Sequence, residues 1–87
     1  MYMDSKIVIG SYLDVAGYTE KTLLRNAARC KRCGDEIESK HNYDAVQCSC
    51  KFIMVDGGLI SPRILGEESD IEFLYEFLVF SPPEENT

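Results

Sequence analysis

The stretch that decides the fold is Cys30-Lys31-Arg32-Cys33, which is followed after fourteen residues by Cys48-Ser49-Cys50. Four thiolates grouped in two close pairs form the ligand set of a closed tetrahedral zinc site. Gly34 directly follows the first pair and supplies the backbone freedom that a metal-binding turn needs. The pattern therefore predicts a structural zinc ion held by Cys30, Cys33, Cys48 and Cys50.

Three other interpretations of the cysteines stay open. A redox pair of the Cys-x-x-Cys type would need a βαβ setting, for which the chain has neither the length nor the pattern. Disulfides would need an oxidising compartment, and the thiols could also be buried without any ligand. A hydrolytic zinc site is disfavoured, because such sites keep an open position and usually use histidines, whereas this chain has one histidine.

The length of 87 residues allows one domain. Folding at this size removes only about 60–65% of the chain's surface from water, so a core of side chains alone would be marginally stable. An apolar content of 45% nevertheless predicts a folded protein. We expect one zinc-stapled domain at residues 1–80, with a ribbon core at residues 28–58 and a flexible tail at residues 81–87.

Short segments rich in β-branched and aromatic residues flank the cysteines. The predicted fold class is a small β-rich α+β domain, a zinc-ribbon-like antiparallel meander with one or two short helices. A helix is expected at residues 20–29, where apolar residues recur at helical spacing, but Leu24, Asn26 and Ala28 also alternate as in a strand that leads to Cys30. Ser69-Asp70-Ile71-Glu72 has the capping-box form and predicts a helical turn at residues 70–75. Strands are expected at residues 6–9, 11–15, 36–39, 43–48, 51–55 and 76–80.

The charges are unevenly distributed along the chain. Nine basic and fifteen acidic residues give a net charge of −6, which disfavours a general polyanion binder. Basic residues gather around the first cysteine pair, and no basic residue follows Arg63. Either these charges are solvated faces or they form an oriented binding surface. The predicted partner surface consists of Arg25, Arg29, Arg32, Glu72 and Glu76.

Targeting and membrane signals are absent from the sequence. No apolar run exceeds four residues, which predicts neither a membrane helix nor a secretory signal. We therefore expect a cytoplasmic protein whose thiols stay reduced and free to bind metal. The segment at residues 6–9 would also allow a homodimer if it forms an edge strand.

The sequence around the cysteines resembles a known family. The run ARCKRCGDEIESKH at residues 28–41, the CSC at residues 48–50 and the VDGG at residues 55–58 are similar to small zinc-ribbon-like proteins of bacteria and their phages. That family has no characterised function. The similarity is dense from about residue 26 to residue 58 and thins toward residue 74.

Two positions depart from the family pattern. Tyr43 stands where the family usually has a second histidine, and Lys51 stands where it usually has a glycine. The second histidine is therefore not essential to this protein, unless its function has changed.

The resemblance also draws attention to polar residues that zinc binding does not need. A serine, a lysine, a histidine, two aspartates and a glycine pair supply donors, one positive charge and backbone amides, which suit a phosphate, a carboxylate or a nucleotide edge. The structural interpretation is that the Asp-Gly-Gly forms a hairpin turn and that the other aspartate braces a loop. The predicted ligand-binding residues are Ser39, Lys40, His41, Asp44, Asp56, Gly57 and Gly58.

The sequence contains neither a Gly-x-Ser-x-Gly elbow nor a Gly-rich phosphate loop, so we expect a protein that is not an enzyme. The expected function is stoichiometric binding that inhibits a bacterial host protein of defence or transcription. A phage-encoded or phage-related origin is implied by the resemblance alone. Two alternatives stay open: a binder that sequesters a phosphate-bearing, nucleotide-type molecule, and a nucleic-acid-associated zinc-ribbon module.

Overall fold

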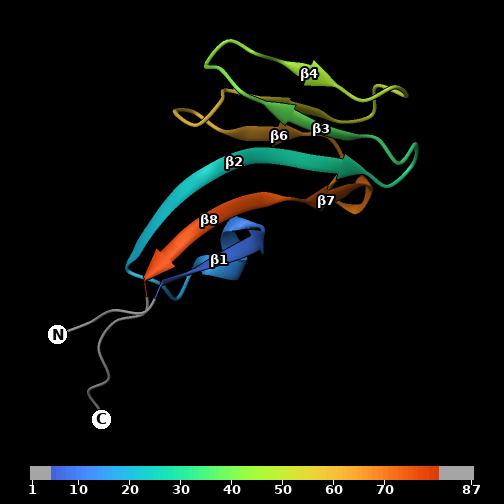
Figure 1. Cartoon of the computed structure of the whole chain (residues 1–87). Helices are drawn as coiled ribbons and strands as arrows, with labels where there is room; N and C mark the ends of the chain where they lie inside the picture. Colours follow the sequence, from blue (N-terminus) through green and yellow to red (C-terminus); the bar gives the residue numbers. More distant parts are fainter. Residues whose placement is uncertain (1–4, 81–87) are drawn as a thin grey trace, which may run out of the picture.

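The computed structural model describes residues 5–80, which form two antiparallel sheets and two short 3₁₀ helices (Figure 1). The tail expected at residues 81–87 lies outside the described residues. No helix among residues 5–80 is long and apolar enough to cross a membrane. The elements are β1 (Ser5–Gly10), η1 (Tyr12–Val15), β2 (Glu20–Cys30), β3 (Glu36–Ser39), β4 (Val46–Gln47), β5 (Met54–Asp56), β6 (Arg63–Leu65), η2 (Glu68–Asp70), β7 (Ile71–Phe73) and β8 (Tyr75–Phe80).

The long strand β2 organises the larger, five-stranded sheet. Its order is β1-β8-β2-β3, and β7 pairs with the end of β2 beyond β8. Ala28, for example, lies between Ile37 of β3 and Phe73 of β7. The smaller sheet has the order β4-β5-β6 and is an antiparallel meander, but the segment 36–39 that was expected to belong to it pairs with β2 in the larger sheet, and β6 takes its place. The prediction of a small β-rich, zinc-ribbon-like fold is confirmed, and its helical content consists of 3₁₀ turns.

The helix expected at residues 20–29 is wrong, because the segment forms β2. Its alternative as a strand is correct. Strands pair with β2 on both sides, and this pairing outweighs the helical preference of the leucines and alanines. The register shifts between Leu23 and Arg25, which is the signature of a β-bulge.

The strand expected at residues 11–15 is also wrong, because residues 12–15 form the 3₁₀ helix η1. Ser11 and Asp14 build a capping box: the Leu13 amide donates to Ser11 Oγ at 3.2 Å, and the Ser11 amide donates to Asp14 Oδ2 at 2.7 Å. These bonds satisfy the amides at the start of the turn. The turn buries Val15 in the core.

The structure also differs from the helical turn expected at residues 70–75. The 3₁₀ helix η2 ends at Asp70 and has no side-chain cap, and the chain continues as β7 and β8. Glu72 pairs with Arg29 across the sheet and is thus not part of a capping box. The sheet partner therefore decides the conformation of this segment.

The remaining strand predictions are confirmed in position and corrected in length. Residues 36–39 form β3, and the strands expected at residues 6–9 and 76–80 lie within β1 and β8. The strands expected at residues 43–48 and 51–55 shrink to β4 and β5, because the chain between them turns to present two cysteines. The sequence did not predict β6.

The core consists of two clusters along one face of the larger sheet. One cluster lies against the smaller sheet and includes Ile37, Ile53 and Val55, together with two of the cysteines. The other lies under η1 and includes Val15 and Phe77. Two side chains, Ile64 and Phe73, pack against both clusters and join them.

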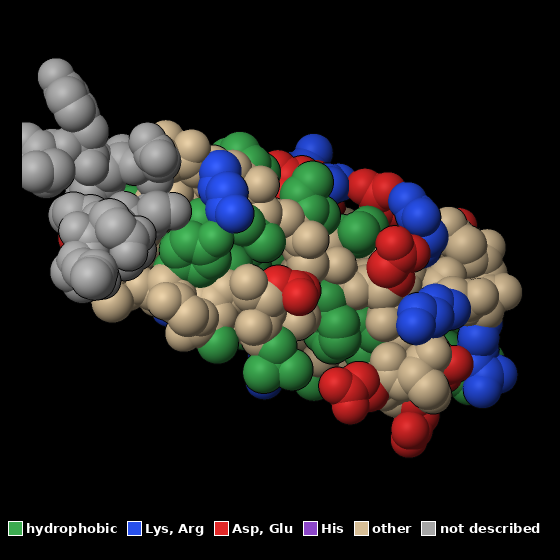
Figure 2. Space-filling view, turned by 90° about the horizontal axis from the view of Figure 1, so that it is seen from below, with side chains coloured by type: hydrophobic (Ala, Val, Ile, Leu, Met, Phe, Trp, Pro, Cys, Tyr) green, Lys and Arg blue, Asp and Glu red, His purple; other side chains and the backbone are tan. Residues whose placement is uncertain are grey.

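Figure 2 shows one outer side of the molecule. Hydrophobic side chains lie over its left and middle, and charged side chains gather toward the end that carries the cysteine turns. Acidic and basic side chains are mixed at this end, although the basic residues of the sequence gather around the first cysteine pair.

Candidate metal centre

The first cysteine pair lies on the turn that follows β2. Cys30 is the last residue of the strand, and Cys33 lies three residues later in the turn. The Gly34 amide donates to the Cys30 carbonyl at 2.8 Å, and Gly34 has φ +81°. Glycine adopts this left-handed conformation without steric cost, which explains its place directly after Cys33.

The second cysteine pair lies on the turn between β4 and β5. The Lys51 amide donates to the Cys48 carbonyl at 3.0 Å, and the Cys48 amide donates to the Ile53 carbonyl at 3.3 Å. Lys51 has φ +67°, which is uncommon for a residue with a side chain. This conformation gives a physical reason for the glycine that the resembling family usually has at this position.

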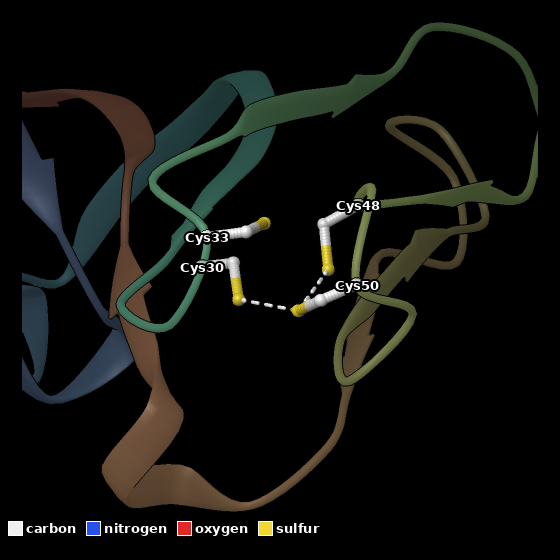
Figure 3. A group of neighbouring side chains, drawn as sticks. All are labelled: Cys30, Cys33, Cys48 and Cys50. Carbon is white, nitrogen blue, oxygen red and sulfur yellow. Dashed lines mark hydrogen bonds between the residues drawn. The ribbon is translucent and has the colours of Figure 1, made fainter.

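The two turns face each other and bring the four sulfur atoms together (Figure 3). All four Sγ atoms lie within 4.8 Å of one another, with 3.5 Å between Cys30 and Cys50 and 3.6 Å between Cys48 and Cys50. These distances are too long for a disulfide. A tetrahedron with metal–sulfur bonds of about 2.3 Å has sulfur–sulfur edges of about 3.8 Å. The four cysteines therefore form a cluster that can hold a metal ion.

The thiols influence one another's protonation. Burial raises the pKa of the Cys48 thiol, but a backbone hydrogen bond at Ile53 and the neighbouring thiols outweigh it and lower the pKa to about 6. At Cys50 a backbone hydrogen bond at Phe52 lowers the pKa, whereas burial and the other thiols raise it to about 12. Thiolates this close repel one another, so the last proton is lost with difficulty. A bound cation would neutralise this repulsion.

Asp35 connects the two cysteine turns directly. Its carboxylate accepts hydrogen bonds from the backbone amide of Ser49 at 2.7 Å and from the Ser49 hydroxyl. These bonds hold the pKa of Asp35 below its ordinary value. Ser49 lies between Cys48 and Cys50, so Asp35 holds the second turn in place from the first. Asp35 belongs to the family pattern, but the sequence alone does not indicate this role.

Arg32 fastens the first turn to the rest of the fold. Its Nε lies 3.0 Å from Oδ1 of the buried Asp70, and its guanidinium stacks 4.1 Å over the centre of the Phe52 ring. The Lys31 amide also donates to the Asp70 carbonyl at 2.8 Å. Arg32 therefore bridges the first cysteine turn, η2 and the second turn.

Three of the predicted ligand-binding residues join two loops, one at residues 40–45 and one at residues 57–62. The buried Ser39 hydroxyl donates to the Asp44 carbonyl at 2.5 Å and accepts from the Gly58 amide at 2.9 Å. The Asp44 carboxylate accepts from the Lys40 amide at 3.0 Å. Ser39, Asp44 and Gly58 thus hold the loops in a fixed arrangement.

Asn26 is a structural residue that sequence analysis missed. It is fully buried, and its Nδ2 donates to the carbonyls of Asp56 at 2.9 Å and Gly58 at 2.8 Å. The signal in the sequence is a polar residue directly before Ala27 and Ala28, in what proves to be the buried part of β2. Asn26 fixes the start of the 57–62 loop from β2.

The other predicted ligand-binding residues line two adjoining hollows between these loops. One hollow, of about 560 Å³, is lined by Asp56 and Gly57 among others, and the Asp56 carboxylate accepts from Arg63 Nη2 at 2.9 Å. The other, of about 390 Å³, is lined by Lys40 and His41 among others. The predicted set therefore divides into residues that hold the loops and residues that face the space between them.

Four of the five predicted partner-surface residues lie together on the solvent side of the larger sheet. Arg25 pairs with Glu36, Glu38 and Glu76 at 2.8, 3.1 and 3.4 Å. The Glu36 and Glu38 carboxylates raise the pKa of Arg25, although burial opposes the shift. Across the same face Arg29 pairs with Glu36 at 3.1 Å and with Glu72 at 3.4 Å. Arg32 lies apart from them, at the metal centre.

Comparison with known proteins gives one match. A family model described as a domain of unknown function, DUF7695, matches residues 22–66, which is more than half of the 87-residue chain. A search of curated proteins and a search of solved structures each found no match. The matched segment contains the four cysteines and the two loops that enclose the hollows. The chain therefore belongs to the DUF7695 family.

Proposed function

We propose that the cysteine centre binds one structural zinc ion. The observation that carries this proposal is the set of four Sγ atoms within 4.8 Å on two facing turns. Zinc prefers four tetrahedral ligands, and a shell filled by protein thiolates is typical of structural sites. Such sites contribute apparent binding free energies of about 10–16 kcal/mol in peptides, which exceeds the stability of a small domain.

We further propose that the protein is not an enzyme and acts by binding another protein stoichiometrically. Four protein ligands leave the metal no open position for a water or a substrate, which catalytic zinc requires. The resemblance to bacterial and phage proteins makes a cytoplasmic bacterial host protein the proposed partner, and inhibition the proposed outcome.

The arrangement of charges favours a protein partner over nucleic acid. Arg25, Arg29 and Arg32 are the residues that a nucleic-acid module would use, but each pairs with carboxylates. Phosphate would have to displace these partners from a chain of net charge −6.

A nucleotide-type ligand is also less well supported than a protein. The expected phosphate-binding site included the Gly58 amide and the Ser39 hydroxyl. The Gly58 amide, however, donates a hydrogen bond to the Ser39 hydroxyl. They are therefore occupied within the fold.

The proposed binding function is tested by capture from a bacterial lysate. The full chain, loaded with zinc and immobilised, is incubated with the lysate, and bound proteins and small molecules are identified by mass spectrometry. We expect one protein at a near-equimolar ratio, retained after nuclease treatment. A chain treated with a chelator is the control and should no longer retain the captured protein. Capture of nucleic acid alone, or of nothing, would contradict the function.

A further inference from the structure

We propose that the two hollows between the loops at residues 40–45 and 57–62, here called the loop groove, bind the protein partner. The occupant that fits is an acidic segment carrying an aromatic or aliphatic side chain. This inference rests on the proposed binding function and names its site.

Large apolar side chains are unusually exposed on the loop groove. Tyr43 is 97% exposed, Ile60 is 75% exposed and Leu59 is 48% exposed. Tyr43 and Ile60 line both hollows, and Leu59 lines the smaller one. Apolar and aromatic side chains gathered around a hollow are typical of the centre of a protein interface. Because these side chains are exposed, they do not contribute to the packing of the core.

The loops that carry these side chains are held rigidly. Six residues at positions 57–62 connect β5 to β6, where a tight hairpin would need two. Gly57 and Gly58 have φ values of +89° and +58°, and the Ser39 and Asn26 bonds fix this conformation. A surface that is already ordered loses less conformational entropy on binding. The groove is therefore prepared for a partner.

The charges around the groove select an acidic partner. Lys40 and His41 line the smaller hollow, and neither side chain has an ion-pair partner within residues 5–80. Of the charged side chains that line the two hollows, Asp56 and Arg63 pair with each other at 2.9 Å, and this leaves Lys40 as the lining charge without an ion-pair partner within residues 5–80. The Asp44 carboxylate, which accepts the Lys40 backbone amide, lines neither hollow. The lining charge that is open to a partner is thus the Lys40 ammonium group, which attracts carboxylates.

The shape of the groove favours a protein over a small molecule. The hollows share Asn42, Tyr43 and Ile60, so they form one continuous depression. Both are open to solvent, whereas small-molecule sites enclose about 70–90% of their ligand. An open depression with apolar rims receives a protruding side chain of a larger partner.

The loops that line the groove and the turns that carry the cysteines lie at opposite ends of the smaller sheet (Figure 1). The loop at residues 40–45 precedes β4, and the second cysteine turn follows it. The metal can therefore order the sheet without occupying the binding surface.

The experiment selects peptides from a displayed random twelve-residue library on the zinc-loaded full chain. The dissociation constants of the selected peptides are then measured for Tyr43→Ser, Ile60→Ser and Lys40→Glu. Leu13→Ser is the matched control, because Leu13 is 83% exposed but lies on η1, away from the groove. All four side chains are exposed, and the zinc content of each variant verifies its fold.

We expect enriched peptides with Asp or Glu beside Phe, Tyr or Leu. Tyr43→Ser and Ile60→Ser should each weaken binding about tenfold or more, Lys40→Glu should weaken it at low salt, and Leu13→Ser should not. Failure to enrich peptides, enrichment of basic peptides, or equal binding by Tyr43→Ser would overturn the inference. If a partner captured from lysate still binds the Tyr43→Ser and Ile60→Ser chains, the groove is wrong and the binding function stands.

Discussion

Asp35 shows how a residue that is not a ligand can set the geometry of a metal site. It accepts two hydrogen bonds from Ser49, which lies between the second pair of cysteines. Without the carboxylate the two turns would lose these hydrogen bonds and would be joined through the metal and through the stacking of Arg32 on Phe52. Groups that orient ligands in this way influence metal affinity strongly.

Replacing Asp35 by alanine should therefore weaken zinc binding about 10- to 100-fold while the strands remain folded. The measurement is competition with a chromophoric chelator at neutral pH. Asp14→Ala is the control, because Asp14 makes similar hydrogen bonds to Ser11 in η1, away from the cysteines. Equal zinc affinity in Asp35→Ala and the wild type would show that the link is dispensable.

Gly58 is constrained by both its conformation and its neighbours. A Cβ atom there would lie 2.6 Å from the carbonyl carbon and 2.8 Å from the carbonyl oxygen of His41, and φ is +58°. Gly58→Ala should destabilise the protein by about 1–3 kcal/mol, measured by urea unfolding with zinc bound. Gly17→Ala should have little effect, because nothing lies within 4 Å of that Cβ. Equal losses of the free energy of unfolding in Gly58→Ala and Gly17→Ala would contradict the tight contact between the two loops.

At the scale of the element, β2 is held by charge on one face and by burial on the other. Arg25 lies among three glutamates of β3 and β8, and Asn26, next in sequence, is fully buried. Isolated surface ion pairs contribute little, but one arginine shared by several carboxylates keeps like charges from repelling.

Arg25→Gln should lower the free energy of unfolding by about 1 kcal/mol at low salt, and by less in concentrated salt. The loss arises because three glutamates are left close together without their cation. Lys40→Gln, which removes a cation with no ion-pair partner within residues 5–80, should change the free energy little. A loss independent of salt would mean that Arg25 acts through packing.

The aromatic cluster under η1 leads us to expect a loss of stability at high pH. Tyr75 packs edge-on against Tyr12 at 5.0 Å, and burial raises the pKa of Tyr75 to about 12 from its ordinary 10.0. The unfolded chain therefore loses this proton first, so stability is full below pH 10 and falls as pH rises toward 12. Relative to Tyr75→Phe, the wild type should lose about 2 kcal/mol between pH 9 and pH 12. If the free energies of unfolding in urea of the wild type and of Tyr75→Phe change with pH in parallel, this result would contradict the burial of the Tyr75 hydroxyl.

At the scale of the whole molecule, the sequence predicts what is local and misses what depends on distant partners. The cysteine spacing predicts the metal cluster because each pair acts within one turn. The conformation of residues 20–30 could not be decided locally, since it depends on β3, β7 and β8. The loop groove could not be predicted for the same reason: Tyr43 and Ile60 line one hollow because hydrogen bonds of Ser39 and Asn26 fix the two loops that carry them.

The two ends of the smaller sheet carry the two candidate sites of the molecule. The cysteine turns close one end, and the loops that carry Tyr43 and Ile60 form the other. Because the smaller sheet has strands of only two or three residues, its own hydrogen bonds cannot order it. The metal is therefore expected to hold the loops at residues 40–45 and 57–62, the proposed binding site, in place indirectly.

Metal analysis combined with amide spectra before and after chelation tests most directly whether the fold of the smaller sheet depends on a bound metal. The full chain is purified without added metal, its bound metal is quantified by mass spectrometry, and ¹⁵N-labelled spectra follow its removal under reducing conditions. We predict one zinc ion per chain and loss of the dispersed signals of residues 28–58 when zinc is removed. Iron in the site, no bound metal, or an unchanged spectrum after complete removal would contradict the structural zinc centre.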